Sequence, residues 1–289
     1  MKYIASIFFV FTFLLNFSQA NAQETGTPIY TADFGVQMYS FRNIVPEIGL
    51  ESTLDFIEEH GITLIEGGGI PDGFEQDEYL NLLSTRGIST PSVGVGFSAL
   101  RDNVDEIIEQ SKSVSATYVM CAWIDHEVGN FNFLNASEAV EVFNEAGKKL
   151  AENGLTFMYH FHGYELIPHR EGTLLDYIMN NTNPDWVSYQ MDVFWIQFGG
   201  GNPTHLLQKY GKRWVSLHLK DMKKGTMKDH TGLTSGQNNV VIGTGEIDFV
   251  GVLKEAQKLG ITYMFIEDES DDPLGQIPLS IEYIKGLRH

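Results

Sequence analysis

A short pattern that recurs four times restricts the folds open to this chain. In each copy an amphipathic stretch ends at a glycine, and isoleucine or leucine then leads into a β-branched or aromatic run. The copies are EEHGITL (58–64), STRGIST (84–90), AENGLTF (151–157) and QKLGITY (257–263). Glycine is favoured directly after a helix because the chain there often adopts a left-handed conformation. Each copy therefore predicts a helix followed at once by a strand.

Eight candidate strands alternate with candidate helices along the chain. The strands are expected at 34–40, 62–67, 88–95, 116–123, 155–160, 187–192, 214–220 and 261–267. Helices are expected between them, for example at 53–60 after an N-cap at Ser52 and at 136–153. Eight strand–helix units predict a single α/β (β/α)8 barrel over residues 34–289. A doubly wound sheet is the alternative, although no glycine-rich phosphate loop follows the first strand.

The first 22 residues have the pattern of a secretory signal peptide. Lys2 precedes an apolar run, and an A-x-A sequence ends at residue 22. A membrane anchor is the alternative, but the apolar run is short and polar residues interrupt its end. We therefore expect cleavage after residue 22, an N-terminal extension over 23–33, an exported and periplasmic protein, and no membrane attachment after cleavage.

Charge and cysteine content narrow the classes of partner. The formal charge is −19, from 19 basic and 38 acidic residues. Such a surface repels phosphate backbones, so nucleic-acid binding is disfavoured and a neutral substrate is favoured. Cys121 is the single cysteine, so no internal disulfide can form, and its apolar surroundings TYVMCAWI predict an inert core residue.

Polar residues gather at the carboxyl ends of the predicted strands, where barrels of this class place their active sites. Taken singly, each has a structural explanation as a helix cap, a satisfied buried group or part of a solvated loop. Strand ends that meet at one mouth make a shared function the stronger interpretation. The residues are Gln37, Tyr39 and Glu66 from early strands, then His160, His162, Glu165, Asp192, Trp195, His218, Lys220, Glu267, Asp268 and Glu269.

Carboxylates and imidazoles in this arrangement predict a site for one divalent metal ion, Mn, Mg, Co or Zn. Asp192, His218 and Glu267 can each send one side chain inward from adjacent strands. A fourth ligand is expected from the fifth strand, with Glu165 as first choice and His160 as second. The long connection 221–245 is expected to be a lid or a binding loop.

The ordered motifs YHFHGYEL, MDVFW, LHLKD and FIEDESDDP resemble those of the xylose isomerase-like TIM-barrel family of sugar phosphate isomerases/epimerases. GVQMYSFR and GTGEIDF are also similar, so the resemblance covers essentially the whole mature chain. It implies a (β/α)8 fold and one metal ion held by Glu, Asp, His and Glu, of which Asp192, His218 and Glu267 match the last three. On the fifth strand His160 stands where many epimerases have a glutamate, in the YHxHxxE pattern of one branch. Apurinic endonucleases of the same superfamily bind several zinc ions, but the negative charge and sparse ligand set argue against that activity.

The expected chemistry is proton abstraction next to a sugar carbonyl, with the metal stabilising the enediolate. His160 is the candidate base, and Glu267 acts from the opposite side. Lys220 either faces a substrate oxygen or forms an ion pair with Asp192 or Asp221. Substrate contacts are expected from Gln37, Tyr39, His162, Trp195 and Lys220.

Three functions follow from the same site. Reprotonation on carbon gives a sugar isomerase or epimerase, whereas expulsion of a β-leaving group gives a lyase, for instance on a 3-keto-glycoside. A sugar-binding barrel without catalysis is the third. The expected ligand is a small carbohydrate, a keto-sugar or keto-glycoside, and since sugar phosphates are not expected in a periplasm, a phosphate group is not. A homo-oligomer is compatible with the sequence.

Overall fold

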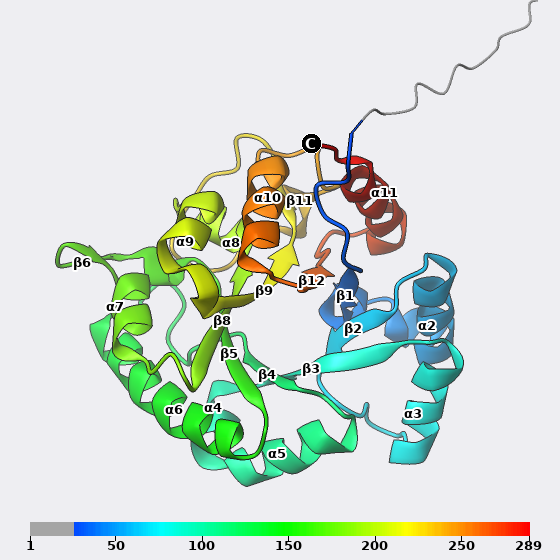
Figure 1. The fold of residues 1–289 in the computed structure, drawn as a ribbon, viewed down its shortest axis with the longest axis horizontal. Helices are drawn as coiled ribbons and strands as arrows, with labels where there is room; N and C mark the ends of the chain where they lie inside the picture. Colours follow the sequence, from blue (N-terminus) through cyan, green and yellow to red (C-terminus); the bar gives the residue numbers. More distant parts are fainter. Residues whose placement is uncertain (1–25) are drawn as a thin grey trace, which may run out of the picture.

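The computed structural model describes residues 26–289, which form a closed barrel of eight parallel strands (Figure 1). Around the barrel the order is β1, β12, β9, β8, β5, β4, β3 and β2. The bounds are β1 Gly35–Gln37, β2 Leu64–Gly67, β3 Ser89–Val95, β4 Tyr118–Cys121, β5 Thr156–Phe161, β8 Val187–Asp192, β9 Trp214–Leu219 and β12 Tyr263–Ile266. The predicted barrel is confirmed. The predicted signal peptide, residues 1–22, lies outside the described residues.

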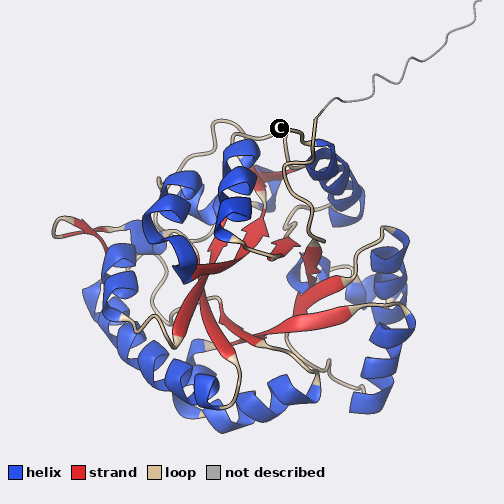
Figure 2. Ribbon diagram, in the orientation of Figure 1, coloured by secondary structure: helices blue, strands red, loops and turns tan. Residues whose placement is uncertain are grey.

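Helices surround the barrel as an outer ring (Figure 2). They are α1 Val45–Ile48, α2 Leu50–Glu59, α3 Gln76–Thr85, α4 Phe97–Asp102, α5 Val104–Ser113, α6 Phe133–Glu152, α7 Leu174–Asn181, α8 Val193–Phe198, α9 Pro203–Tyr210, α10 Phe249–Leu259 and α11 Pro273–Gly286. Two short antiparallel pairs lie in loops: β6 Pro168–His169 with β7 Gly172–Thr173, and β10 Asp221–Met222 with β11 Asn239–Val240. The helices bury their apolar faces against the strands, which gives one continuous core.

The four predicted helix-to-strand junctions are present. Gly61, Gly87, Gly154 and Gly260 have φ angles of 68°, 64°, 78° and 75°. These are left-handed conformations, which glycine adopts without the clash that a Cβ atom brings. Each glycine therefore ends a helix and returns the chain toward the barrel.

Two helix starts differ from the prediction. α2 begins at Leu50, with Gly49 at its N-cap, so Ser52 lies inside the first turn and does not cap the helix. α6 begins at Phe133 because the Asn132 side chain accepts a hydrogen bond from the Leu134 backbone at 2.9 Å. A capping side chain satisfies backbone N–H groups that a helix start leaves unpaired, and it thereby fixes the start.

The first predicted strand, 34–40, is shorter than expected. β1 ends at Gln37, and a turn of 3₁₀ helix follows from Met38 to Phe41. The Gln37 side chain accepts a hydrogen bond from the Tyr39 backbone N–H at 3.2 Å, which stabilises the turn. Tyr39 is therefore turned to the rim of the barrel, where its side chain is 53% exposed.

Alternation along the strands decides which side chains enter the barrel. On β5, Tyr159 packs against Phe143 of α6, with ring centroids 4.8 Å apart. His160, the next residue, contacts His218 of β9 inside the barrel, with centroids 4.5 Å apart. Successive strand residues point to opposite faces, so one face of each strand joins the core under the helices and the other lines the interior.

Four further features complete the description. The N-terminal segment pairs with the C-terminus, because the Ile29 N–H donates to Leu287 O at 3.1 Å and the His289 N–H donates to Thr27 O at 3.0 Å. Cys121 is buried as a free thiol, as expected for a core residue, and burial raises its pKa to about 12.

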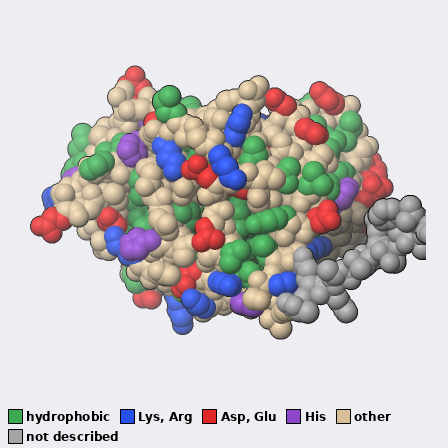
Figure 3. Space-filling view, turned by 90° about the horizontal axis from the view of Figure 1, so that it is seen from above, with side chains coloured by type: hydrophobic (Ala, Val, Ile, Leu, Met, Phe, Trp, Pro, Cys, Tyr) green, Lys and Arg blue, Asp and Glu red, His purple; other side chains and the backbone are tan. Residues whose placement is uncertain are grey.

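On the face shown in Figure 3, acidic, basic and apolar side chains lie in small separate groups. Within residues 26–289, none of the helices has the length and apolarity needed to cross a bilayer.

Candidate metal centre

Three buried side chains from adjacent strands converge at the carboxyl end of the barrel. His160 of β5, Asp192 of β8 and His218 of β9 each offer one ligand atom, and these atoms lie within 4.8 Å of one another. The strand register explains the grouping, because Asp192 lies directly beside His218 and His160 directly beside Gln190. Nitrogen and oxygen donors at such spacing suit a divalent metal ion.

Each of the three side chains has one polar atom engaged and one free. The Oδ1 atom of Asp192 accepts the backbone N–H groups of Phe194 at 2.7 Å and Trp195 at 3.0 Å, as the N-cap of α8. The Nε2 atom of His218 contacts Glu66 Oε2 at 2.5 Å. The Nδ1 atom of His160 contacts Gln190 Oε1 at 2.7 Å.

The free atoms are the ones that face the cluster. Asp192 Oδ2 and His218 Nδ1 are buried and have no hydrogen-bond partner among the described residues. His160 Nε2 lies 4.0 Å from Asp192 Oδ2. A buried polar atom without a partner is costly, which is why such atoms in a native protein call for an explanation such as an ion. The donor set therefore fits a divalent metal ion held by these three atoms.

Glu267 supplies a fourth donor at the same place. Its Oε2 atom lies 3.4 Å from His218 Nδ1 and 3.6 Å from Lys220 Nζ. Burial by itself raises the pKa of Glu267, but the charge of Lys220 and the contact with His218 outweigh burial and hold this pKa well below its usual range. Glu267 is therefore a carboxylate at neutral pH, as a metal ligand or base must be.

Lys220 lies beneath the pocket with two acidic partners. Its ammonium forms an ion pair with Glu269 and lies 3.6 Å from Glu267 Oε2. The same nitrogen lies 4.7 Å above the centroid of the Trp195 ring, a cation–π contact. The expected ion pair with Asp192 or Asp221 is thus replaced by one with Glu269 and Glu267.

Asp221, the other expected partner, anchors the long loop instead. Its carboxylate accepts backbone N–H groups of Met222, Gly243, Gly245 and Ile247, at 2.8 to 3.2 Å. These bonds close the base of the connection 221–245. They leave no oxygen of Asp221 for a lysine.

Glu165, the first-choice fourth ligand, is not part of the cluster. It is buried and accepts a hydrogen bond from the Tyr159 hydroxyl and one from the His162 backbone N–H at 3.3 Å. Tyr159 faces the helices, so Glu165 lies on the outer side of β5, whereas His160 faces the interior. The structure therefore favours the second choice, His160, because strand alternation places it inside the barrel.

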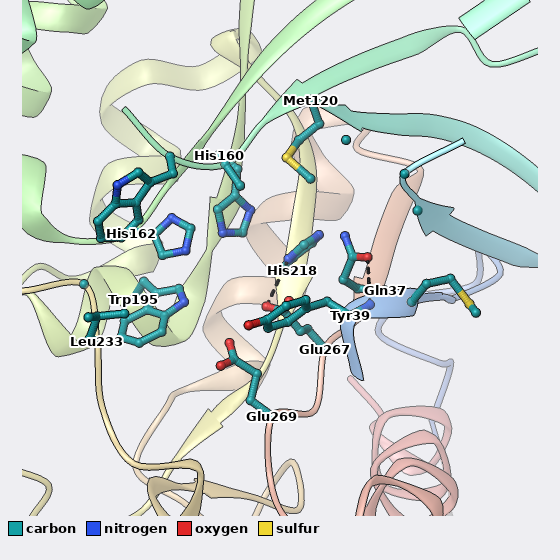
Figure 4. A pocket seen from close by; sticks show the side chains of 17 residues that line it. Gln37, Tyr39, Met120, His160, His162, Trp195, His218, Leu233, Glu267 and Glu269 are labelled. Atoms are coloured by element: carbon teal, nitrogen blue, oxygen red, sulfur yellow. Dashed lines mark hydrogen bonds and ion pairs between the residues drawn. The ribbon is translucent and has the colours of Figure 1, made fainter. Parts of the chain in front are cut away.

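A pocket of about 430 Å³ opens beside these residues. Figure 4 shows His160 and His218 directed to the same space, with His162 and Trp195 on one side and Gln37 on the other. All four expected substrate contacts other than Lys220 line this pocket: Gln37, Tyr39, His162 and Trp195. Gly232 and Leu233 also line it, so the connection 221–245 does contribute to the pocket, as expected for a binding loop.

Two site residues were missed in the sequence, and the contact made by a third was not foreseen. Trp123, two residues beyond the end of β4, lines the pocket and meets His162 edge-on, with centroids 5.3 Å apart. Gln190 and Glu66 lie behind the histidines. Gln190 could have been found, because it stands two residues before Asp192 and so shares its face of the strand. Glu66 was noticed as polar, but the sequence gives no signal that it meets His218.

Comparisons with known proteins agree with the barrel fold. Inosose dehydratase of Salmonella typhimurium is 26% identical to this chain, over 88% of this chain and 94% of its own length. A sugar phosphate isomerase/epimerase from Parabacteroides distasonis has the same fold, with a TM-score of 0.72 and 19% identity, covering 87% of this chain and 93% of that one. The IOLI protein, solved with a bound zinc atom, superposes with a TM-score of 0.68 at 17% identity, covering 87% and 96%.

The family match covers most of the chain and includes every ligand candidate. Residues 54–287 match the model of a single protein family. This range contains seven of the eight barrel strands, from β2 to β12, and with them His160, Asp192, His218 and Glu267. The chain belongs to the xylose isomerase-like TIM-barrel family.

Proposed function

We propose that this protein is a divalent-metal-dependent enzyme that removes a proton next to the carbonyl group of a neutral keto-sugar or keto-cyclitol. The observation that carries the proposal is the set of free, buried donor atoms on Asp192 and His218, which converge with His160 and Glu267 beside the pocket. A purely sugar-binding barrel has no need of such a set.

His160, Asp192, His218 and Glu267 would hold the metal. When bound, a divalent ion supplies Lewis-acid stabilisation of negative charge on a carbonyl oxygen. A ligand role for His160 changes the expected assignment of the base. With Nδ1 engaged by Gln190 and Nε2 directed at the cluster, His160 has no nitrogen left for the substrate proton.

Glu267 is the proposed base. It lines the pocket and has two carboxylate oxygens, so one can face the metal while the other receives a proton. Lys220 holds a fixed positive charge between Glu267 and Glu269, close to the site where negative charge develops on a substrate oxygen. Trp195, Trp123 and Tyr39 offer apolar surfaces for the faces of a sugar or cyclitol ring.

Elimination is the fate that we favour for the resulting enediolate. A relative that matches 88% of this chain is named inosose dehydratase, and a dehydratase removes water from its substrate. Once a proton next to a ketone has been removed, loss of water expels the hydroxyl group on the β carbon. A lyase acting on a 3-keto-glycoside would follow the same course, with the aglycone as leaving group. Reprotonation, and so isomerisation or epimerisation, is the second candidate, because His162 lines the pocket on a different side from Glu267 (Figure 4).

A labelling experiment separates these fates. The metal-loaded protein is incubated in D2O with an inosose, a 3-keto-glycoside and candidate keto-sugars, and the products are followed by NMR and mass spectrometry. Loss of water or aglycone supports elimination. Deuterium incorporated at carbon with the leaving group retained supports isomerisation and rejects elimination. Binding without either change, and without a metal requirement, rejects the enzyme proposal.

Export is a separate proposal, supported by the sequence of residues 1–22, where a lysine precedes an apolar run and an A-x-A site. Expression of the full chain in a Gram-negative host, followed by fractionation and N-terminal sequencing, tests it. A mature N-terminus at residue 23 in the periplasm is expected. Retention of the full-length chain in the cytoplasm contradicts the proposal.

A further inference from the structure

Two buried residues behind the candidate metal centre contact its histidines, and neither lines the pocket. We infer that Glu66 and Gln190 are positioning residues that together decide which ring nitrogen of His160 and His218 faces the metal. This inference rests on the proposed metal centre and deepens it. It concerns the placement of hydrogen atoms, which can be measured in the metal-free protein.

The contacts form one continuous chain of hydrogen bonds. The Gln190 Oε1 atom lies 2.7 Å from His160 Nδ1, and Gln190 Nε2 lies 3.1 Å from Glu66 Oε1. Glu66 Oε2 in turn lies 2.5 Å from His218 Nε2. The side chains of Glu66 and Gln190 are fully buried, so water does not compete for these bonds.

The chemistry of these groups decides which one donates in each hydrogen bond of the series. A carboxylate only accepts hydrogen bonds, so Glu66 requires a donor at each oxygen. Gln190 must therefore turn its NH2 group to Glu66, and its carbonyl oxygen must face His160. That oxygen accepts a hydrogen bond only if Nδ1 of His160 carries the proton, which leaves the lone pair of Nε2 directed at the metal site.

Gln37 and Ser216, which also contact Glu66 and Gln190, leave these hydrogen-bond directions unchanged. Gln37 donates from Nε2 to Glu66 Oε2 at 2.8 Å, and its Oε1 is held by the Tyr39 backbone N–H at 3.2 Å. Ser216 Oγ lies 2.9 Å from Gln190 Nε2, but a hydroxyl can donate or accept, so it suits either orientation of the amide. The choice therefore depends on Glu66.

The variant Glu66→Gln exposes this dependence. An amide accepts at its oxygen alone. An oxygen in the place of Oε2 already accepts from His218 at 2.5 Å and from Gln37 at 2.8 Å, so it has no lone pair left for Gln190 Nε2, which lies 3.3 Å from it. If Gln190 turns over, His160 must accept at Nδ1 and carries its proton on Nε2, toward the metal. If residue 66 turns its NH2 group to His218, then His218 carries its proton on Nδ1, again toward the metal. Either arrangement replaces one lone pair of the ligand set by an N–H group.

The double variant Glu66→Gln/Gln190→Glu restores the pattern. The amide at 66 accepts from His218 and Gln37 at its oxygen and donates to the carboxylate at 190, which accepts from His160 Nδ1–H and from Ser216. Every hydrogen bond is kept while the negative charge moves from one histidine to the other. The single variant Gln190→Glu places two carboxylates next to each other, so the hydrogen bond between residues 66 and 190 is lost.

The experiment measures zinc affinity by competition titration and the His160 tautomer by 15N NMR of the metal-free protein. For Glu66→Gln we expect about 10–100-fold weaker zinc binding, as is typical of changes in groups that orient metal ligands. We expect the double variant to regain most of that affinity, and His160 to carry its proton on Nδ1 in the wild type and the double variant. Glu255→Gln is the matched control, because it alters a Glu–Gln hydrogen bond between α9 and α10, from Gln208 at 3.3 Å.

The outcomes are separable. Unchanged zinc affinity in Glu66→Gln, or a double variant no better than the single one while both are folded by circular dichroism, overturns the inference and leaves the metal centre intact. A wild-type protein that binds no divalent metal refutes the proposed function instead. In that case the His160 tautomer still tests the positioning role of Glu66 and Gln190. A proton on Nε2 of His160 in the wild type contradicts that role.

Discussion

Glu66 and His218 meet inside the barrel at 2.5 Å, between Oε2 and Nε2, although their strands are not neighbours in the sheet. β2 lies between β1 and β3, and β9 lies between β8 and β12. A carboxylate bound to the outer nitrogen of a metal-binding imidazole fixes the ring and its tautomer. The contact therefore links β2 to the candidate metal centre across the barrel interior, and it leaves His218 Nδ1 on the side of that centre.

Asp192→Asn tests the metal centre with little change of structure. The asparagine oxygen can still cap α8 by accepting from Phe194 and Trp195, while an NH2 group replaces the metal-facing Oδ2. We expect loss of bound metal, measured by elemental analysis of the purified protein, and loss of activity.

The matched control for this variant is Asp248→Asn, at the N-cap of α10, where the side chain accepts from the Gly251 N–H at 2.9 Å. This variant should retain metal. If Asp192→Asn binds metal as the wild type does, the ligand assignment is wrong.

Lys220→Met tests the buried ion pair. Removal of the ammonium leaves Glu267 and Glu269 facing each other without a cation, and an uncompensated charge in a buried pair costs about 3 kcal/mol of stability. We expect a lower free energy of unfolding in urea. The double variant Lys220→Met/Glu269→Gln should recover part of the loss, because one of the two carboxylates is then neutral.

Lys149→Met is the comparison on the surface. Lys149 pairs with Asp105 at 2.7 Å, but the two side chains are 42% and 84% exposed. Solvent screens such a pair, so we expect a change below about 1 kcal/mol. Equal losses in Lys220→Met and Lys149→Met would argue against a special role for the buried pair.

Glu165 should make stability depend on pH. Burial raises the pKa of this carboxyl from 4.5 to about 7. Between these values the folded protein keeps a proton that the unfolded chain has lost, so stability is highest below pH 4.5 and falls as pH rises to 7, by roughly 3 kcal/mol. Glu165→Gln, which stays neutral, should flatten this part of the profile and be more stable than the wild type at pH 8.

Urea unfolding at several pH values measures this effect. Glu152→Gln, on an exposed position of α6, should reproduce the wild-type profile. A Glu165→Gln profile that runs parallel to that of the wild type shows that the carboxyl is already ionised in the folded protein at low pH.

Gly163 fixes the loop between His162 and Glu165. Its φ angle is 84°, and a Cβ atom there would collide with the carbonyl oxygen of Trp195. Gly163→Ala should therefore destabilise the protein severely, because the contact is with backbone that cannot move aside. Gly154→Ala shares the left-handed conformation, with φ 78°, but has open space around its Cβ position.

Thermal unfolding of the two alanine variants separates crowding from backbone strain. Gly154→Ala should cost about 1–2 kcal/mol, the usual penalty of the left-handed conformation. A similar midpoint for both variants would show that the loop after β5 can shift away from Trp195.

Local patterns in the sequence determined the fold and the site residues whose direction follows from strand alternation. Glycine after an amphipathic stretch marks a helix end wherever it occurs, and period-two alternation assigns a strand residue to a face. These signals correctly placed the eight strands and aimed His218 and Lys220 into the barrel. Asp192 was assigned to the metal site in the same way. It ends β8, and the expected order of the barrel places this strand beside β9, which carries His218.

Only the tertiary structure decided the rest. Glu165 lies five residues past His160, beyond a left-handed glycine, and the path of that loop, not strand alternation, turns its side chain toward Tyr159. Glu66 reaches His218 only because the sheet closes, which brings non-adjacent strands within hydrogen-bonding distance. The sequence alone therefore identified residues whose direction follows from their position on a strand. Closure of the barrel selected their partners, since a contact across its interior has no period or spacing along the chain.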